Sequence, residues 1–396
     1  MSSYPSSRPQ DRNAFEVAII CALDLEAGAM IALFDEFWEH DAQYKKAHGD
    51  TNSYTIGRIG SNHVVLVHMP HIGKVSAASV AANLRSSFPQ IRLSLLVGIC
   101  GGVPFIDNGK HEITLGDIVI STHIAQSDFG RQYSDSFIRK NTPQDNLGRP
   151  NPEIKAFLSN LQVKSVQTKL EAQTQTHLLT VLGTKDFRSA YPGVHEDRLY
   201  ESTYRHKHQH TQACAICAKS TYPEDSVCKT ALSLSCAELG CDASQLISRC
   251  RIQDAINNGS NSHSPMIHFG AVASGDQVIK SAQHRDRIAE QENVIAFEME
   301  GAGFWDSIPT IVVKGVCDYA DSHKNKGWQL YAAATAAACA KSLLQIWRPV
   351  EKSSQDEHQG KAPFPQSIQQ FFGGNFNARK NNYNGNTYTA QTMTFD

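Results

Sequence analysis

The sequence predicts an α/β fold in which a central sheet carries one long polar insertion. Compact β-branched runs that are typical of buried strands alternate with alanine-rich helical segments. The alternation is interrupted at residues 126–265, where the chain becomes polar and rich in Gln, Ser and His. With 396 residues, the chain is long enough for one large domain plus an appendage, or for two modest domains.

The composition argues against several classes of protein. A formal net charge of -2 gives no bias toward polyanions, so no nucleic-acid partner is expected. No run approaches the ~20 apolar residues of a membrane helix, and the Ser/Pro-rich start has no apolar signal core. We therefore expect a cytoplasmic protein without a membrane partner. The ten cysteines are scattered among apolar residues, which suggests reduced thiols that mostly fill the core.

Local patterns predict the elements before the insertion. The apolar run at 93–102 ends in glycines that let a ligand approach the backbone. Polar residues 60–62 between two apolar runs favour a hairpin, and small residues at 76–84 favour a helix packed closely on the sheet. In order, we expect a strand at 15–23, a helix at 24–33, hairpin strands at 54–59 and 63–69, a helix at 76–84, a strand at 93–102, and a turn and strand within 113–121.

The insertion shows little periodicity. It is expected to hold one or two amphipathic helices, for which residues 152–161 and 229–236 are the best candidates. Regular structure resumes with a strand at 266–276 and ends with an alanine-dense helix at 328–347 that closes the domain.

Carboxylates flank one buried strand near the end of the domain. Residues 308–313 predict a strand buried on both faces, residues 297–301 are expected to enter a helix before it, and Asp318 follows it. Ligands bind at the carboxyl ends of strands in open α/β sheets, which makes Asp318 a candidate site residue. From position alone, Glu298, Glu300 and Asp318 fit carboxylates favoured by helix dipoles equally well.

The two ends of the chain predict no packed core. Residues 1–13 are expected to form a disordered leader, and residues 349–370 a polar linker. The stretch 371–396 is rich in Asn and Gly with interleaved aromatic residues. Such a composition either stays disordered or stacks as cross-β through Asn ladders.

Six short motifs recur in an order that resembles the purine/uridine phosphorylase superfamily. The chain looks most like the nucleosidase-type domains of fungal NLR-like (STAND) proteins and is similar to bacterial methylthioadenosine/adenosylhomocysteine nucleosidases. The resemblance implies a single mixed-sheet α/β/α domain over 14–348, interrupted by the insertion at about 126–265. The motifs are Glu26 and residues 97–102, 115–117, 273–276, 297–300 and 317–318.

The resemblance also implies roles in cleaving an N-glycosidic bond, which needs an acid near the departing base and a stabiliser near the sugar. Asp318 matches the acid that donates to purine N7, and Glu26 matches the glutamate that activates water. Glu300 and the Met299 backbone match the groups that hold the ribose hydroxyls, with Glu298 nearby. The implied base pocket comprises Gly101, Gly102, Phe269, Val278 and Asp318.

The choice of nucleophile depends on two other positions. Hexameric phosphorylases of the family place arginines where this chain has Glu26 and Leu96, because phosphate needs fixed positive groups. A carboxylate there repels phosphate, so hydrolysis is favoured. Two departures from the bacterial nucleosidases are Val278, in place of an aromatic residue that packs on the base, and Lys314, in place of an arginine.

The insertion carries basic and metal-ligating side chains. As a lid over the ribose 5′ side, it could bind a 5′-phosphate, or the triphosphate of ATP, through Arg198, Tyr204 and His206 together with Lys324; a solvated loop fits the same residues. Cys214 and Cys217 form one CxxC near histidines and are weak candidates for structural zinc, beside the interpretation as ordinary loop cysteines. No cofactor is expected.

These observations lead to three hypotheses of function. The first is a purine nucleoside N-ribohydrolase that acts on adenosine-type nucleosides or their 5′-phosphorylated forms with water as the nucleophile. The second is a phosphorylase that uses phosphate. The third is a signalling or scaffold module that assembles through its C-terminal tail, with an NLR-like protein as the partner. The resemblance further implies a homo-oligomer.

Overall fold

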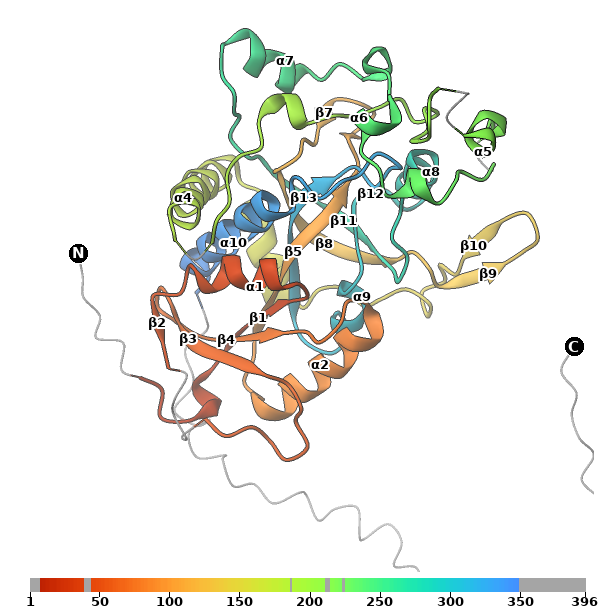
Figure 1. Cartoon of the computed structure of the whole chain (residues 1–396). Helices are drawn as coiled ribbons and strands as arrows, with labels where there is room; N and C mark the ends of the chain where they lie inside the picture. The colour runs from red at the N-terminus through yellow and green to blue at the C-terminus, as the bar shows by residue number, and fades with distance from the viewer. Residues whose placement is uncertain (1–7, 39–43, 186, 211–213, 223–224, 349–396) are drawn as a thin grey trace, which may run out of the picture. The chain divides into compact units, whose positions relative to one another are not determined.

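The computed structural model describes residues 8–38, 44–185, 187–210, 214–222 and 225–348. The predicted linker and tail at 349–396, and most of the predicted leader, lie outside the described residues. The chain up to Trp347 forms one compact unit, whose elements Figure 1 shows in chain order. In the part of the chain that the structure describes, no helix is both long enough and apolar enough to span a bilayer.

Within the described residues, one large mixed sheet has the strand order β12-β11-β8-β13-β5-β1-β4-β3-β2. The buried apolar runs of the sequence form its central strands, because a strand covered on both faces keeps only apolar side chains. The strands are β1 (Val17–Cys21), β2 (Glu36–Phe37), β3 (Tyr54–Ile59), β4 (Asn62–His68), β5 (Leu93–Gly102), β8 (Ile118–Gln126), β11 (Ile267–Ser274), β12 (Val294–Glu298) and β13 (Thr310–Asp318).

The topology brings several strand ends together. Strand β5 runs parallel to both β1 and β13, so the carboxyl ends of these three strands meet at one edge. Strand β12 also pairs with the end of β5, where Phe297 lies opposite Gly101. This extra pairing closes β12, β11, β8, β13 and β5 into a ring.

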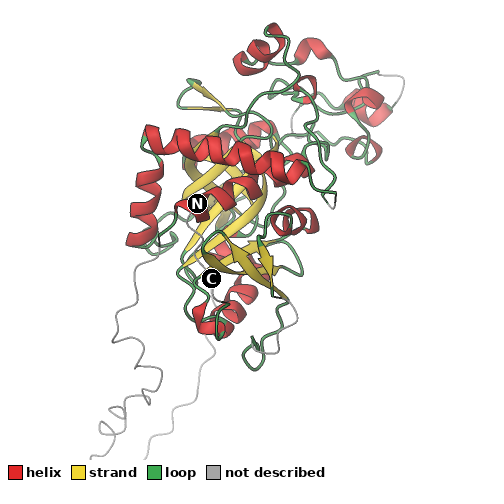
Figure 2. Cartoon of the chain, turned by 90° about the vertical axis from the view of Figure 1, so that its left-hand side faces the viewer, coloured by secondary structure: helices red, strands yellow, loops and turns green. Residues whose placement is uncertain are grey.

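Helices enclose the sheet, as Figure 2 shows. The predicted alanine-dense helix is α10 (Gln329–Ile346), which packs against α1 (Asp24–Ile31), β5 and β13. A Cβ atom on Gly315 of β13 would lie 1.9 Å from the Ala332 carbonyl oxygen, so only glycine permits this close approach. The other helices around the sheet are α2 (Lys74–Ser87), α8 (Ala282–Glu292) and the short α9 (Gly301–Phe304), which packs against α2.

The insertion begins after β8 and is less regular than the sheet. Its helix α3 (Pro152–Leu161) has the predicted bounds, and Asn151 caps it by accepting a hydrogen bond from the Ile154 amide. A hairpin of β6 (Phe105–Ile106) and β7 (His111–Glu112) precedes β8. The insertion itself also contains the hairpin of β9 (Gly130–Gln132) and β10 (Phe137–Arg139) and the helices α4 (Lys164–Leu182), α5 (Ala215–Lys219), α6 (Cys236–Leu239) and α7 (Cys250–Asn257).

One helix predicted in the insertion was wrong, and one helix was missed. Residues 229–236 do not form a continuous helix: a 3₁₀ turn covers Thr230–Leu232, and Ser235 then starts α6 by accepting a hydrogen bond from the Glu238 amide. The longest helix of the insertion, α4, was missed because its sequence is largely polar. It is stabilised by packing against α10 rather than by its own amphipathic pattern.

The boundaries near the predicted site shift by a few residues. Phe297 and Glu298 are the last residues of β12, and the helix expected from 297–301 begins at Gly301 and is only one turn long. Asp318 is the last residue of β13 rather than the residue after a strand. Each shift places a carboxylate at the edge where strands end.

Candidate active site

A cavity of about 240 Å³ opens at the edge where β1, β5 and β13 end. Three segments that are far apart in the sequence contribute carboxylates to it: the start of α1, the β12–α9 junction and the end of β13. Its lining residues are Ala22, Leu23, Glu26, Ile72, Ile99, Cys100, Gly101, Gln277, Val278, Ile279, Phe297, Glu298, Met299, Glu300, Cys317, Asp318, Ala320, Lys324 and Gln329.

Glu26 is fixed by backbone amides at the amino end of α1. Its Oε2 atom accepts hydrogen bonds of 2.9 Å from the amides of Ala22 and Leu23, and its Oε1 atom accepts one of 2.8 Å from Ile99. Burial raises the pKa of the Glu26 carboxyl, although attraction to Lys314 partly opposes this and repulsion from Glu300 adds to it. A buried carboxylate with a raised pKa is suited to accept a proton.

Gly98 makes room for the Glu26 carboxylate. A Cβ atom at position 98 would lie 2.1 Å from Oε1 of Glu26, a separation that no side chain tolerates. No role was predicted for this glycine from the sequence. The signal that could have found it was the glycine in the middle of a strand that otherwise carries large apolar residues.

Glu298 and Glu300 differ in their partners although they are two residues apart. The Glu298 carboxylate accepts hydrogen bonds from the amides of Glu300 and Gly301 at 2.9–3.0 Å, which satisfies the start of α9. Glu300 instead points its Oε2 atom at the Lys314 Nζ atom, 3.2 Å away, while its Oε1 atom accepts a 3.4 Å hydrogen bond from the Gly73 amide. Glu298 therefore caps the helix, and Glu300 is held by a cation.

Lys314 interacts electrostatically with three carboxylates. Its side chain is 1% exposed. Burial by itself lowers the pKa of this ammonium group, but attraction to Glu300, Glu26 and Glu298 outweighs burial and raises it. Burial likewise raises the pKa of Glu298, against the attraction of Lys314. Lys314 thus remains charged and offsets the negative charge beneath the cavity.

Asp318 is held by its own loop. Its Oδ1 atom accepts a 2.8 Å hydrogen bond from the Ala320 amide, and its Oδ2 atom lies 3.0 Å from the Lys324 Nζ atom. Ala320 has φ 51°, a conformation that non-glycine residues rarely adopt and that surrounding contacts must enforce. A Cβ atom on Gly101 would lie 3.0 Å from Asp318 Oδ1, so this glycine keeps the carboxylate accessible.

Two side chains of the insertion form hydrogen bonds with Tyr319, the residue after Asp318. The hydroxyl of Tyr319 donates to Asp197 Oδ1 at 2.6 Å and accepts from Arg249 Nη1 at 2.9 Å. The Arg249 guanidinium also lies 5.2 Å from the centroid of the Tyr319 ring, within cation–π range. The loop that follows β13 is therefore anchored by two side chains of the insertion.

The structure corrects two residues of the expected base pocket. Phe269 lies in the first half of β11, opposite Ile120, and packs on the core rather than lining the cavity. Gly102 is one residue too far along β5, where a Cβ atom would meet Val316 instead. The aromatic residue that lines the cavity is Phe297, which was not predicted for the base. The expected residues that do line it are Glu26, Gly101, Val278, Glu298, Met299, Glu300, Asp318 and Lys324.

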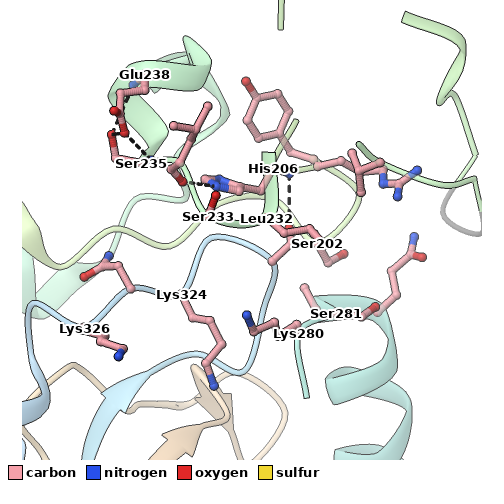
Figure 3. A pocket seen from close by; sticks show the side chains of 18 of the residues that line it. Ser202, His206, Leu232, Ser233, Ser235, Glu238, Lys280, Ser281, Lys324 and Lys326 are labelled. Carbon is pink, nitrogen blue, oxygen red and sulfur yellow. Dashed lines mark hydrogen bonds between the residues drawn. The ribbon is translucent and has the colours of Figure 1, made fainter. Parts of the chain in front are cut away.

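A second cavity of about 670 Å³ adjoins the first and shares Lys324 and Gln329 with it. Figure 3 shows Lys280, Lys324 and Lys326 on one side of this space and residues of the insertion on the other. Lys280, on the segment between β11 and α8, was not predicted for this space. We refer to this space as the lysine cavity.

The residues expected for a 5′ group are only partly brought together. Tyr204, His206 and Lys324 line the lysine cavity, but Arg198 does not and instead pairs with Glu196 at 3.2 Å. The ring of His206 is already engaged, because its Nε2 atom lies 2.9 Å from the Leu234 carbonyl oxygen and its Nδ1 atom faces cysteine sulfur atoms. The ring of His206 is thus not available to an anion, and Lys324 is available only if it leaves Asp318, whose Oδ2 atom lies 3.0 Å from its Nζ atom.

Comparison with known proteins places this geometry in a family. The sequence pattern of the phosphorylase superfamily matches residues 16–216, about half of the chain. A nucleotide-binding leucine-rich repeat (NLR)-like protein of Hyaloscypha variabilis is 30% identical over 351 residues, which cover 87% of this chain and 30% of that protein. A 5′-methylthioadenosine/S-adenosylhomocysteine nucleosidase of Mycobacterium bovis is 26% identical over 93 residues, or 22% of this chain and 36% of that protein.

The chain spans about a third of the length of these relatives. Among solved structures, the 5′-methylthioadenosine/S-adenosylhomocysteine nucleosidase of Helicobacter pylori is similar, with a TM-score of 0.47 and 13% identity over 85% of this chain and 100% of that one. The matched pattern covers Glu26 and the glycine-ending strand β5, around which the cavity is built. The chain belongs to the phosphorylase superfamily.

Proposed function

We propose that the protein is a purine nucleoside N-ribohydrolase, which cleaves the N-glycosidic bond with water as the nucleophile. The observation that carries this proposal is the convergence of Glu26, Glu300 and Asp318 around one cavity, each held by different partners. Three carboxylates in separate environments can take three separate roles.

The chemistry needs a proton at the base and a nucleophile at the sugar. As the N-glycosidic bond breaks, positive charge develops on the ribose and negative charge on the departing base. Asp318, in its protonated form, gives a proton to purine N7, and Glu26 takes a proton from the attacking water. Glu300 accepts hydrogen bonds from the ribose hydroxyls, and the Lys314 ammonium group fixes its orientation. The protons balance, since one is lost to Glu26 and one is supplied by Asp318.

Water is favoured over phosphate by the charges around the cavity. Among the described residues that line it, the carboxylates are Glu26, Glu298, Glu300 and Asp318, and none is an arginine. The buried cation, Lys314, is already engaged with Glu300. A phosphate ion at this position would meet repulsion without a bidentate partner.

Measuring base release with and without phosphate tests the nucleophile. The protein is incubated with adenosine, inosine, guanosine, uridine, methylthioadenosine and ATP in phosphate-free buffer, and the released base is followed by chromatography. We expect purine release and a free sugar product without phosphate. Strict dependence on phosphate, with ribose 1-phosphate formed, would instead establish a phosphorylase. A preference for uridine would overturn the role of Asp318 at purine N7.

We further propose that the substrate carries a 5′-phosphate chain, as in ATP. The lysine cavity opens beside the site and offers Lys280, Lys324 and Lys326 as positive groups. A ribose held by Glu300 with its base at Asp318 can extend its 5′ substituent into this space. Comparing kcat/KM for adenosine, AMP, ADP and ATP tests this step, and equal values across the series would contradict it.

An assembly role is the second candidate function, favoured by the similarity to the NLR-like protein. In this proposal the chain forms a homo-oligomer, and its tail at 371–396 assembles with an NLR-like partner. Light scattering of the full chain and of a chain ending at residue 370 tests both steps. A scaffold without catalysis would keep its biological output in Asp318→Asn and Glu26→Gln variants, whereas an effector enzyme would lose it.

A further inference from the structure

Among the described residues, two groups of cysteines and histidines have side chains that converge in the insertion. The His206 site consists of His206, Cys236, Cys241 and His323, and the His208 site consists of His208, Cys214, Cys217 and Cys228. Within each group the four ligand atoms all lie within 4.8 Å of one another. Only Cys214 and Cys217 were expected from the sequence as metal candidates.

We propose that each site binds one zinc ion, and that the ion in the His206 site fastens the insertion to the loop that follows Asp318. Cys₂His₂ and Cys₃His are ligand sets of closed structural zinc sites, in which no coordination position is left for a substrate. This inference goes beyond the proposed function and does not rest on it.

The distances within the His206 site fit a tetrahedral ion. Zinc lies about 2.3 Å from sulfur and about 2.05 Å from nitrogen, so tetrahedral angles separate the two ligand atoms by about 3.6 Å. The Sγ atom of Cys236 lies 3.6 Å from Nδ1 of His206 and 3.5 Å from Nδ1 of His323. The corresponding distances from Cys241 are 3.8 and 3.9 Å. An ion at the centre would reach these four atoms with little movement.

The His208 site shows the same spacing. The Nδ1 atom of His208 lies 3.6 Å from the Sγ atoms of both Cys217 and Cys228. All five cysteines of the two sites are free thiols rather than disulfides. Three thiolates with one neutral imidazole leave a net charge of -1 on a zinc complex, and the Lys207 ammonium group lies nearby, donating to the Cys217 carbonyl oxygen at 3.1 Å.

Both histidines of the His206 site are oriented as zinc ligands are. The Nε2 atom of His206 lies 2.9 Å from the Leu234 carbonyl oxygen, and that of His323 lies 3.1 Å from the Tyr204 carbonyl oxygen. A carbonyl oxygen only accepts, so each Nε2 carries the proton and each Nδ1 presents its lone pair to the sulfur atoms. A metal-ligating histidine usually donates its other ring N–H to such an acceptor, which fixes the tautomer.

The fold around these sites has a small apolar core. Helices α5 and α6 have five and four residues, and among the described residues the fully buried apolar cluster between them comprises Cys217, Ala231 and Leu239. A segment with so small a core needs an additional cross-link to fold, and structural zinc contributes free energy of folding directly. The two ions would be these cross-links.

The His206 site joins two separate parts of the chain. His206, Cys236 and Cys241 belong to the insertion, whereas His323 belongs to the loop after β13, next to Lys324. The ring of His323 stacks on Tyr200 with centroids 4.1 Å apart, and the His206 amide donates to the Ser322 hydroxyl at 3.3 Å. One ion thus fixes the loop that places Lys324 against Asp318 at the mouth of the lysine cavity.

Metal content of the full chain is the direct test. The protein is purified without chelators or a metal-affinity tag, and zinc is measured by mass spectrometry against protein from amino-acid analysis. We expect two zinc ions per chain. A Cys236→Ser/Cys241→Ser variant should lose one, and a Cys217→Ser/Cys228→Ser variant should lose the other. Cys250→Ser, at an exposed cysteine outside both sites, is the control and should keep two.

A second measurement uses the unaltered protein and so tests the proposal even if the variants do not fold. Zinc-edge X-ray absorption of the unaltered protein should give an average first shell of about 2.5 sulfur and 1.5 nitrogen atoms per ion. Hydrogen exchange of the loop 319–326 should accelerate when the metal is removed with a chelator. Folded, metal-free protein with ten titratable thiols, a Cys236–Cys241 disulfide, or an iron–sulfur absorption spectrum would each overturn the proposal.

Discussion

The Nζ atom of Lys324 lies 3.0 Å from the Oδ2 atom of Asp318, and the same lysine lines the neighbouring lysine cavity. One cation therefore borders both the carboxylate that we propose as the acid and the space that we propose for a phosphate chain. A phosphorylated substrate that attracts Lys324 would release Asp318 from its ion pair. We propose that binding of the 5′ group and the position of Lys324 beside Asp318 are coupled in this way.

Lys324→Gln should therefore affect nucleotides more than nucleosides. We expect kcat/KM for ATP to fall by roughly tenfold or more, since each lost charge-assisted hydrogen bond is worth about 1.5–3 kcal/mol. The value for adenosine should change less, because its 5′-hydroxyl does not need the lysine. Steady-state base release measures both. Lys169→Gln, at an exposed lysine on α4, is the matched control, and an equal loss on both substrates would contradict the coupling.

Asp318→Asn should reduce turnover with little effect on binding. An amide cannot supply a proton to purine N7, and a positioned general acid contributes typically about 10²–10⁴-fold to the rate. We expect kcat to fall by about that factor while KM stays within a few-fold, as measured by initial rates of base release. Asp254→Asn on the exposed surface of α7 should leave both constants unchanged. Full activity of the Asp318 variant would exclude this residue as the acid.

The pH dependence should report on Glu26. A base must be deprotonated to accept a proton from water, so the rate should rise with pH until Glu26 is ionised. Burial raises the pKa of this carboxyl, and the acidic limb of kcat should therefore lie above the ordinary glutamate value of 4.5. In Glu26→Gln, hydrolysis should fall sharply and the residual rate should lose this limb. A variant that keeps the limb would assign it to another group.

Gly98→Ala should displace the Glu26 carboxylate while leaving residue 26 itself unaltered. The new Cβ atom would lie 2.1 Å from Glu26 Oε1, so we expect a destabilisation of about 1–3 kcal/mol and a loss of activity. Gly28→Ala on α1 is the comparison, because its Cβ atom would meet Phe187 at an ordinary 3.7 Å. Alanine in a helix is about 0.5–1 kcal/mol more favourable than glycine, so that variant should gain stability in chemical denaturation. Activity without loss in Gly98→Ala would contradict the packing argument.

The sequence by itself determined most strands of the large sheet, the alanine-dense helix and the carboxylates near the strand ends, although β2 and β12 were not predicted as strands. These follow from local patterns, since β-branched runs predict buried strands wherever they occur and small residues predict close packing. For this reason helix α10, predicted at 328–347, was found near its observed bounds, whereas strand β13, predicted at 308–313, was located but extends to Asp318. Glu26, Glu300 and Asp318 were identified by their place in short motifs, and the fold brings all three to one cavity.

Only the tertiary structure decided which distant side chains meet. Phe297 rather than Phe269 lines the cavity because the extra pairing of β12 with β5 turns that strand end toward it. His323 and His206 converge because the insertion folds back onto the loop after β13. Helix α4 is stabilised by packing against α10. Such contacts depend on how separate segments pack against one another, and no local pattern of residues contains that information.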